Sequence, residues 1–252
     1  QIFEKEQPEV VNHHAAQMDV RRSVADPLYD ADVNVKGSLN ILECARKYGV
    51  RQIIYASSGG TVYGEPQYLP CDENHPIQPI CQYGATKYMT EMYLYMYRYM
   101  YGLDYVIFRY PNVYGPRQDP KGEAGVIAIF TGLMSRNEPV TIHGDGLQER
   151  DFVYVQDVAE ANHLALSLTS GGYVYNLGTG KPINVIQIFE ALKEITGYSR
   201  EAIFGPARLG ETRRIYLDST RFQEETGWRP QTSLANGLRK TVEYFKQTEL
   251  VN

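Results

Sequence analysis

Residues 51–57 read RQIIYAS, residues 83–101 read YGATKYMTEMYLYMYRYMY, and residues 105–109 read YVIFR. The two short segments are rich in apolar, aromatic and β-branched residues, which favours strands. The middle segment has the length of a helix, and Gly102 ends it. A strand, a helix and a second strand in this order predict parallel pairing within an α/β fold.

The same alternation extends toward the start of the chain. Residues 10–15 predict a short buried strand, which we expect at an edge of the sheet. Residues 27–48 predict a helix that Asp26 caps and Gly49 ends. We therefore expect residues 1–116 to form an incomplete doubly wound parallel sheet of the Rossmann-like kind.

After residue 116 the apolar segments become shorter and turn signals more frequent. We expect short strands at residues 140–143, 152–155 and 173–177, and amphipathic helices at residues 185–196 and 234–247. We interpret residues 117–252 as a smaller α/β lobe, and we expect the chain to pass between the two lobes.

The composition excludes several classes of function. The chain has 252 residues, 43% of them hydrophobic, and a formal net charge of −5 without a basic stripe, so nucleic acid is not an expected partner. No apolar run reaches the roughly 18 residues that suggest a membrane span, and nothing at the start predicts a signal peptide. The three cysteines and five histidines lack metal-ligand spacing, and free thiols suit a reducing cytoplasm.

Tyr83 and Lys87 form a YxxxK pair that can carry acid–base chemistry. Residues at i and i+4 lie on one face of a helix, within reach of a common ligand. An ammonium group near a phenol favours the phenolate, which lowers the phenol's pKa from about 10 and makes it a candidate general base. The motif alone is common by chance, so its surroundings must decide.

Those surroundings favour a ligand site. The run SSGGTVYG (residues 57–64) follows a predicted strand, and ligands of open α/β sheets bind at the carboxyl ends of strands. Small residues also occur in His14–Gln17 and in Asn34–Ser38. They would let a cofactor approach the backbone, or they would only allow close packing of helix on strand.

At this point a resemblance becomes specific. The motifs HxAAQ (13–17), NxxGS (34–38), SSGGTVYG, YGATK (83–87) and RYPNVYGPRQ (109–118) occur in the order found in extended short-chain dehydrogenases/reductases, and the set is most similar to UDP-glucose 4-epimerases. Three further segments fit in order: residues 144–155, residues 176–180 and residues 227–230. Each motif is moderately specific, whereas the ordered set is very specific.

The resemblance implies a site with NAD as its cofactor and a UDP-sugar as its substrate. It implies Tyr83 as catalytic base, Lys87 as the residue that lowers its pKa and holds the nicotinamide ribose, and Ser58 as catalytic hydroxyl. The implied cofactor contacts are His14, Ala15, Ala16, Gln17, Met18, Asn34, Ser57, Gly59, Tyr83, Lys87 and Pro111. The implied substrate contacts are Thr61, Asn112, Arg150, Arg208 and Glu211, in which the arginines suit phosphate oxygens.

The sequence departs from the family pattern at three places. Gly59 stands where many relatives have the catalytic Ser or Thr, so Ser58 and Thr61 are the nearest substitutes. Cys81 stands where a serine often caps the YxxxK helix, which predicts a weaker cap. No GxxGxxG precedes His13, so we expect either a piece of a longer chain or a short form that binds NAD weakly and loses activity.

Among the family's reactions, the sequence favours 4-epimerisation of UDP-glucose and UDP-galactose. Dehydratase-like relatives carry acidic residues just after the catalytic hydroxyl, where this chain has Gly60 and Thr61. A reductase is a weaker alternative, and an inactive relative that binds nucleotide sugar or serves as a dimerising module is another. Ile215 lies where relatives vary the wall beside the sugar's 2-substituent, which leaves UDP-GlcNAc and UDP-GalNAc open.

The YxxxK helix itself carries tyrosines and methionines on nearly every side. A helix that is apolar all round is expected to be buried on more than one side. Two interpretations remain open: a core helix, or a helix shared with a second subunit of a two-fold homodimer.

Overall fold

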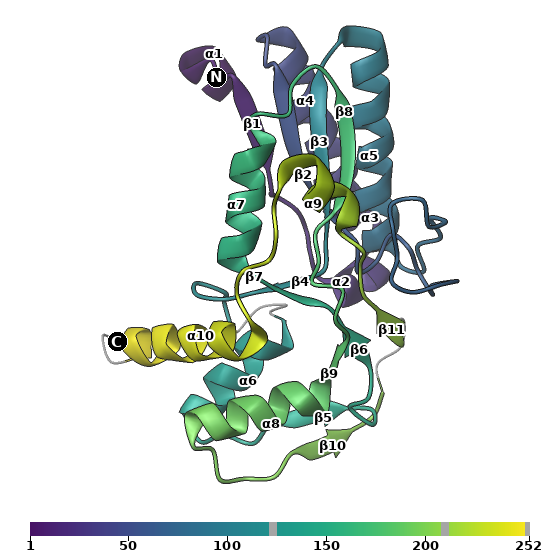
Figure 1. The fold of residues 1–252 in the computed structure, drawn as a ribbon. Coiled ribbons are helices and arrows are strands. Elements are labelled where there is room, and N and C mark those ends of the chain that lie inside the picture. The colour runs from purple at the N-terminus through teal and green to yellow at the C-terminus, as the bar shows by residue number, and fades with distance from the viewer. Residues whose placement is uncertain (121–124, 208–211, 250–252) are drawn as a thin grey trace.

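The computed structural model describes residues 1–120, 125–207 and 212–249. Its main sheet has four parallel strands in the order β1 (Val10–His13), β2 (Gln52–Ser58), β3 (Asp104–Tyr110) and β8 (Gly172–Asn176). Ile54 of β2 pairs with Val106 of β3, and Val106 pairs with Tyr173 of β8. The predicted parallel, Rossmann-like α/β fold is confirmed, with β1 at an edge of this sheet (Figure 1).

Helices cover both faces of the main sheet, because alternate residues of its central strands are apolar on both sides. Ile53 and Ile107 pack with residues of α4 (Gly37–Lys47) and α5 (Gln82–Tyr101). Ile54 and Phe108 point the other way, into a cluster with α7 (Val155–Ala165) and α9 (Thr220–Thr226). Figure 1 shows these two helix layers with the sheet between them. The short helix α1 (Ile2–Glu6) precedes β1.

The single helix expected over residues 27–48 is divided into three parts. It begins as α3 (Pro27–Ala31) with Asp26 as its cap, passes through a π-helical segment (Asp32–Lys36), and continues as α4. Such π segments are rare in proteins, and those that do occur are often found at functional sites. The structure also contains α2 (Val20–Ala25), which we did not predict and which Asp19 caps.

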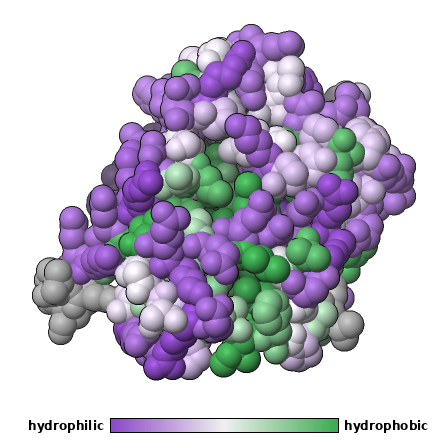
Figure 2. All heavy atoms as spheres, turned by 60° about the horizontal axis from the view of Figure 1, so that its bottom comes forward, coloured by the Kyte–Doolittle hydropathy of each residue, from purple (hydrophilic) through white to green (hydrophobic). Residues whose placement is uncertain are grey.

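The second part of the chain builds a smaller lobe below the main sheet. Its core consists of α6 (Val126–Ser135), α8 (Val185–Thr196) and α10 (Leu234–Glu249), packed through residues such as Phe130, Phe189 and Leu238. Short strands complete the lobe: β5 (Thr141–His143) pairs with β10 (Ile203–Gly205), β6 (Glu149–Arg150) pairs with β9 (Ile183–Asn184) and β11 (Arg214–Ile215), and β4 (Asn112–Tyr114) pairs with β7 (Phe152–Tyr154). The expected helices at 185–196 and 234–247 are present, whereas α6 was not predicted. On the face seen in Figure 2, apolar residues gather across the middle and lower part.

The chain passes between the two parts more than once. β8, α7 and α9 all follow residue 116, yet they pack with the main sheet. The division into an NAD-binding part (1–116) and a nucleotide-sugar-binding lobe (117–252) stays a prediction.

Helix α5 is buried along one side within this chain, so the interpretation as a helix buried in the core on more than one side is not met, and the interpretation as a helix shared with a second subunit stays a prediction. Leu94 is 1% exposed and Tyr97 packs against the sheet, whereas Tyr99 is 84% exposed. The cap at Cys81 is a sulfur atom that accepts a hydrogen bond from the Gly84 amide at 3.5 Å, in keeping with the weak cap expected there. Among the described residues, no helix has both the length and the apolar character needed to cross a membrane.

Candidate active site

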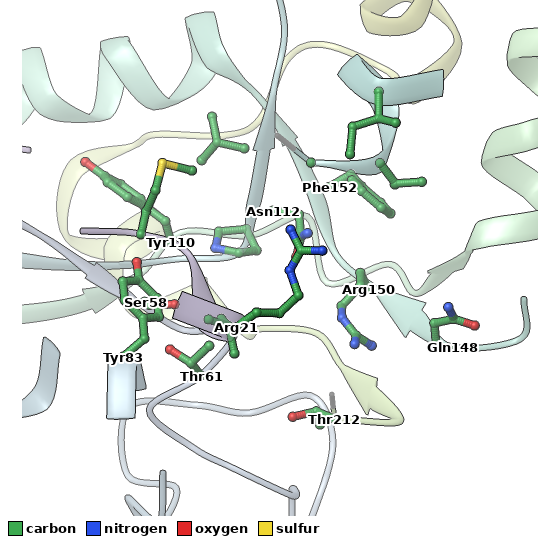
Figure 3. Close-up of a pocket in the computed structure, with 18 of the residues that line it drawn as sticks. Arg21, Ser58, Thr61, Tyr83, Tyr110, Asn112, Gln148, Arg150, Phe152 and Thr212 are labelled. Carbon is green, nitrogen blue, oxygen red and sulfur yellow. The ribbon is translucent and has the colours of Figure 1, made fainter. Parts of the chain in front are cut away.

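A cleft of about 710 Å³ opens between the carboxyl edge of the main sheet and the smaller lobe. Ser58, Thr61 and Tyr83 lie on one side of it, and Gln148, Arg150 and Phe152 lie on the other (Figure 3). Strand β2 ends at this edge with Ser58, and Asn112 follows the end of β3, so both residues reach the same space. This placement agrees with the rule that open α/β sheets bind ligands at the carboxyl ends of their strands.

Lys87 is held beneath the cleft by the main sheet. Its side chain is 3% exposed, and its Nζ donates a hydrogen bond to the carbonyl oxygen of Ala56 at 2.8 Å. The same Nζ lies 5.8 Å from the centre of the Tyr83 ring, so the pair shares one helix face as predicted. Burial lowers the pKa of Lys87 to about 8, while Asp30 and Glu91 act in the opposite direction. Lys87 is therefore an ammonium group that can lose its proton in mildly alkaline solution.

Tyr83 has a pKa that differs in direction from the sequence prediction. Burial raises it to about 12, and the Ser58 side chain acts in the opposite direction. The lowering expected from Lys87 is not seen in the protein without ligands, because loss of hydration around the phenolate raises the pKa; the lowering in the loaded site stays a prediction. Ser58, the predicted catalytic hydroxyl, lines the same cleft as Tyr83.

Gly59 has a structural reason to lack a side chain. A Cβ at this position would collide with Cδ1 of Leu217 and lie 3.1 Å from the Arg109 carbonyl oxygen. The Gly59 amide donates to the Tyr110 carbonyl at 2.8 Å, which fixes the backbone there. Thr61, the other candidate hydroxyl, lines the cleft and has a buried Oγ1 that finds no hydrogen-bond partner within the described parts of the chain. Gly59 itself does not line the cleft, and its predicted cofactor contact stays a prediction.

A buried ion pair beneath the cleft was missed by the sequence analysis. Arg109 Nη2 lies 2.6 Å from Glu91 Oε2, and both side chains are almost completely buried. The Ser57 hydroxyl donates to Glu91 Oε1 at 2.5 Å, and Arg109 Nη1 donates to the Tyr63 hydroxyl at 3.0 Å. The signal was present in the sequence, because Glu91 lies one helical turn after Lys87 on the same face.

The loop after β1 brings only some of its predicted residues to the cleft. His14, Ala16 and Met18 line it, whereas Ala15 and Gln17 do not. The Asn34 side chain is buried and clamps the backbone of Gln17: its Oδ1 accepts from the Gln17 amide at 2.8 Å, and its Nδ2 donates to the Gln17 carbonyl at 3.0 Å. Asn34 thus supports the loop from below. The cleft also contains Arg21, which the sequence analysis did not single out.

On the lobe side, Asn112, Pro111 and Arg150 line the cleft as predicted. The Asn112 amide donates to the Asp151 carbonyl at 3.0 Å, which joins β4 to β7 next to Arg150. An apolar wall from Ile129, Phe130 and Phe152 was not predicted.

Two predicted substrate contacts, Arg208 and Glu211, lie outside the described residues. Ile215 is buried in a cluster with Val62 and Leu217 and does not line this cleft, and its expected place at the sugar wall stays a prediction.

The fold and the cleft together define a class: a dinucleotide-dependent α/β enzyme with Ser, Tyr and Lys gathered at the carboxyl edge of a parallel sheet. The sequence profile of the NAD dependent epimerase/dehydratase family matches residues 1–178. The chain belongs to that family.

Relatives and solved structures narrow the likeness. The chain is 52% identical to a putative UDP-glucose 4-epimerase of Methanocaldococcus jannaschii, over 94% of this chain and 77% of the relative. It is 46% identical to a UDP-glucose 4-epimerase of Mycolicibacterium smegmatis, over 95% of this chain and 76% of the relative. The crystal structure of UDP-glucose 4-epimerase with UDP-glucose from Thermotoga maritima superposes with a TM-score of 0.96 at 50% identity, covering 98% of this chain and 80% of the other. The crystal structure of a Thermus thermophilus UDP-glucose 4-epimerase complex with NAD superposes with a TM-score of 0.92 at 42% identity, covering 97% of this chain and 79% of the other.

The residues present fit NAD, the family's cofactor. Thr61 Oγ1 is a buried oxygen in the cleft that still lacks a partner among the described residues, and Lys87 offers an ammonium group below it. Ala16, Ser58 and Gly60 line the cleft with small side chains, which leaves room for a flat ring against the backbone. His14 and Tyr110 stack at 6.0 Å between ring centres beside them. We infer that His14, Lys87 and Pro111 are among the residues that would hold the cofactor.

Proposed function

We propose that this chain is an NAD-dependent epimerase that inverts carbon 4 of a UDP-hexose, interconverting UDP-glucose and UDP-galactose. The observation that carries the proposal is one shared cleft: Ser58, Tyr83 and Lys87 line its sheet side, and Arg150 lines its lobe side. Ser58, Tyr83 and Lys87 can transfer a proton to or from a sugar hydroxyl, and Arg150 can pair with the oxygens of a diphosphate. A single ligand with a sugar at one end and a diphosphate at the other would meet both.

Tyr83 is the residue that we propose moves the proton of the sugar's 4-hydroxyl. Ser58 lines the same cleft as Tyr83 and lowers the Tyr83 pKa, so we propose that its hydroxyl donates to the Tyr83 oxygen when that oxygen becomes a phenolate. Lys87 supplies a fixed positive charge, and its bond to the Ala56 carbonyl keeps the ammonium group at the base of the cleft. NAD, when bound, supplies the reversible acceptance of hydride from carbon 4.

The Tyr83 pKa of about 12 must fall for this role, because a general base works best with a pKa near the working pH. A positive charge close to the phenol favours the phenolate. The oxidised nicotinamide ring carries such a charge, and His14, Lys87 and Pro111 would place it near Tyr83. We therefore expect Tyr83 to become a base only in the loaded enzyme.

The substrate contacts are proposed for Thr61, Asn112 and Arg150, all of which line the cleft. Arg150 Nη1 donates to its neighbour Glu149's carbonyl at 2.9 Å, which holds the guanidinium near the end of β6. Arg208 and Glu211 remain predicted contacts to the diphosphate and the uridine ribose.

Two measurements test the proposed reaction. Purified protein should contain NAD, seen as a new absorbance band after borohydride reduction, and should interconvert UDP-glucose and UDP-galactose. Tyr83→Phe should lower kcat by at least ~10²-fold, the usual size of a general acid–base contribution. The control is Tyr95→Phe, the same change at an exposed tyrosine of α5, which should leave kcat within about two-fold. Equal activity of Tyr83→Phe and the control would refute the role of Tyr83.

We further propose that two copies associate through the exposed side of α5. This side presents Met89, Met92, Tyr95, Met96, Tyr99 and Met100, each at least 40% exposed. Contiguous apolar side chains of this kind favour an interface over water. The expected result is a dimer by light scattering that dissociates in Tyr95→Glu/Tyr99→Glu. A wild-type monomer across micromolar concentrations would refute the dimer.

We also propose a cytoplasmic location. The support is chemical: Cys44, Cys71 and Cys81 are all free thiols, as expected in a reducing compartment. Fractionation of the source cells should recover the protein with cytoplasmic enzymes, and recovery with the membrane or the external fraction would contradict this location.

A further inference from the structure

A buried carboxylate next to the catalytic helix has no part in the reaction described so far. Asp30, on α3, is 0% exposed. Burial of a carboxylate costs free energy unless hydrogen bonds or a positive charge compensate it. The partners of Asp30 therefore show what this residue does.

Three side chains from separate segments donate hydrogen bonds to Asp30. Gln17 Nε2 donates to Oδ1 at 2.7 Å and Asn34 Nδ2 donates to the same oxygen at 3.1 Å. Thr86 Oγ1 donates to Oδ2 at 2.7 Å. Gln17 belongs to the loop that reaches the cleft, Asn34 to the π-helical segment, and Thr86 to the YGATK motif between Tyr83 and Lys87.

The hydrogen bond from Thr86 places the Asp30 carboxyl group against the residue that directly precedes Lys87 in α5. A buried ammonium group loses hydration and tends to give up its proton, and a nearby negative charge opposes this loss. The titratable groups that act on Lys87 are Asp30 and Glu91, which favour the ammonium form. His13 and His14 also lie near Lys87, but burial lowers the pKa of both, so they are neutral in the pH range where Lys87 titrates. Tyr55 also lies close, with its ring centre 4.9 Å from Nζ.

Glu91 is less able to serve Lys87 alone, because Arg109 and Ser57 already use its oxygens. Within the described parts of the chain, the groups that donate hydrogen bonds to Asp30 are neutral, and no cation forms an ion pair with it. Of the two carboxylates, Asp30 is therefore the one whose charge is more available to stabilise the ammonium form of Lys87.

We propose that Asp30 is a positioning residue of this enzyme: its buried carboxylate ties the loop of Gln17 to the catalytic helix and holds Lys87 in its ammonium form. The effect of Asp30 on turnover rests on the proposed function, whereas the protonation state of Lys87 can be measured without cofactor or substrate. Asp30 itself lies behind Thr86 and touches no reacting atom.

The test uses Asp30→Asn, with Asp32→Asn as its matched control. The asparagine can keep its Oδ1 as acceptor for Gln17 and Asn34. Thr86 Oγ1 can then accept from the new amide and donate to the Tyr83 carbonyl, which lies 3.1 Å away. Asp32 is exposed, lies two residues further along, and pairs with Lys36 at the surface. Its substitution therefore removes the same charge, but from a position in contact with solvent.

The readout is the titration of Lys87, followed by NMR of protein with ¹³C at lysine Cε and assigned with Lys87→Met. In the wild type the midpoint is expected near the pKa of about 8. Asp30→Asn should lower it by on the order of one unit, as expected for loss of a neighbouring opposite charge, and Asp32→Asn should leave it within about 0.2 units. An unchanged or higher midpoint in Asp30→Asn overturns the proposal.

A second measurement needs no variant at residue 30. In wild-type protein, the ¹³Cγ resonance of Asp30 should shift as Lys87 loses its proton near pH 8, and a resonance that stays constant through that range overturns the proposal. The alkaline limb of kcat should move to lower pH in Asp30→Asn by the same amount as the lysine midpoint. An active enzyme with an unmoved midpoint refutes only the role of Asp30. An inactive wild type with a shifted midpoint refutes only the proposed function.

Discussion

The buried pair between Glu91 and Arg109 gives a prediction that can be worked out from the structure. Glu91→Gln removes the negative charge while almost keeping the shape of the side chain. Arg109 would then be a buried cation, 5% exposed as a residue, without a negative partner and with the Tyr63 hydroxyl as a neutral one. Breaking a buried pair by removing one partner costs about 3–5 kcal/mol, because the other charge stays out of water. The glutamine can still accept from Ser57 and Arg109, so we expect the lower end, about 3 kcal/mol.

The assay is urea unfolding followed by the fluorescence of Trp228, the single tryptophan, which is buried beside α9 and the main sheet. The control is Glu138→Gln, which breaks an exposed ion pair with Arg136 and should cost less than about 1 kcal/mol. The double variant Glu91→Leu/Arg109→Met should recover much of the loss, since well-packed apolar residues can replace a buried pair. If Glu91→Gln and Glu138→Gln lose the same free energy of unfolding, the reasoning fails.

Two further predictions concern single positions near the cleft. Gly59→Ser should lower the free energy of unfolding by about 1–3 kcal/mol, because its Cβ collides with Leu217; Gly60→Ser, where the nearest atom lies 4.0 Å from an added Cβ, should change it far less, and equal losses would contradict the collision. The pKa of His13 is lowered from 6.5 to about 4, mainly by burial. Between pH 6.5 and pH 4, His13 is therefore protonated in the unfolded chain and neutral in the folded protein. Stability should therefore fall as pH drops from 6.5 to 4, and less steeply in His13→Gln; identical slopes in urea unfolding at several pH values would contradict this assignment.

The sequence predicted the strands and the YxxxK helix well because their patterns are local. The strands at 51–57 and 105–109 are apolar on both sides, and parallel pairing follows from the helix between them. The helix over 27–48 was predicted as one piece because the side-chain pattern does not reveal a π segment. That segment coincides with Asn34, whose bonds to Gln17 and Thr86 link residues far apart in the sequence. Only the folded chain brings these residues together.

The candidate site divides in the same way. Tyr83 and Lys87 could be paired from their spacing, and their delivery to the carboxyl edge followed from the sheet. The direction of the Tyr83 pKa could not be predicted, because it depends on how completely the surrounding chain removes water from the phenol. Helix α6 was missed because its sequence, VIAIFTGLMS, is apolar all round and lacks a side-chain cap. It supplies Ile129 and Phe130 to the cleft wall, and so part of that wall was missed with it.

The path of the chain has a consequence for engineering. It leaves the main sheet after β3, returns for α7 and β8, leaves again through β9 to β11, returns for α9, and ends at α10 beside α6 and α8 (Figure 1). Exchange of the sugar-facing half with that of a related enzyme therefore cannot be made with one junction. A transplant would need several splice points, and each would fall in a segment that borders the cleft or the sheet. Specificity in this scaffold is more readily changed residue by residue than by swapping modules.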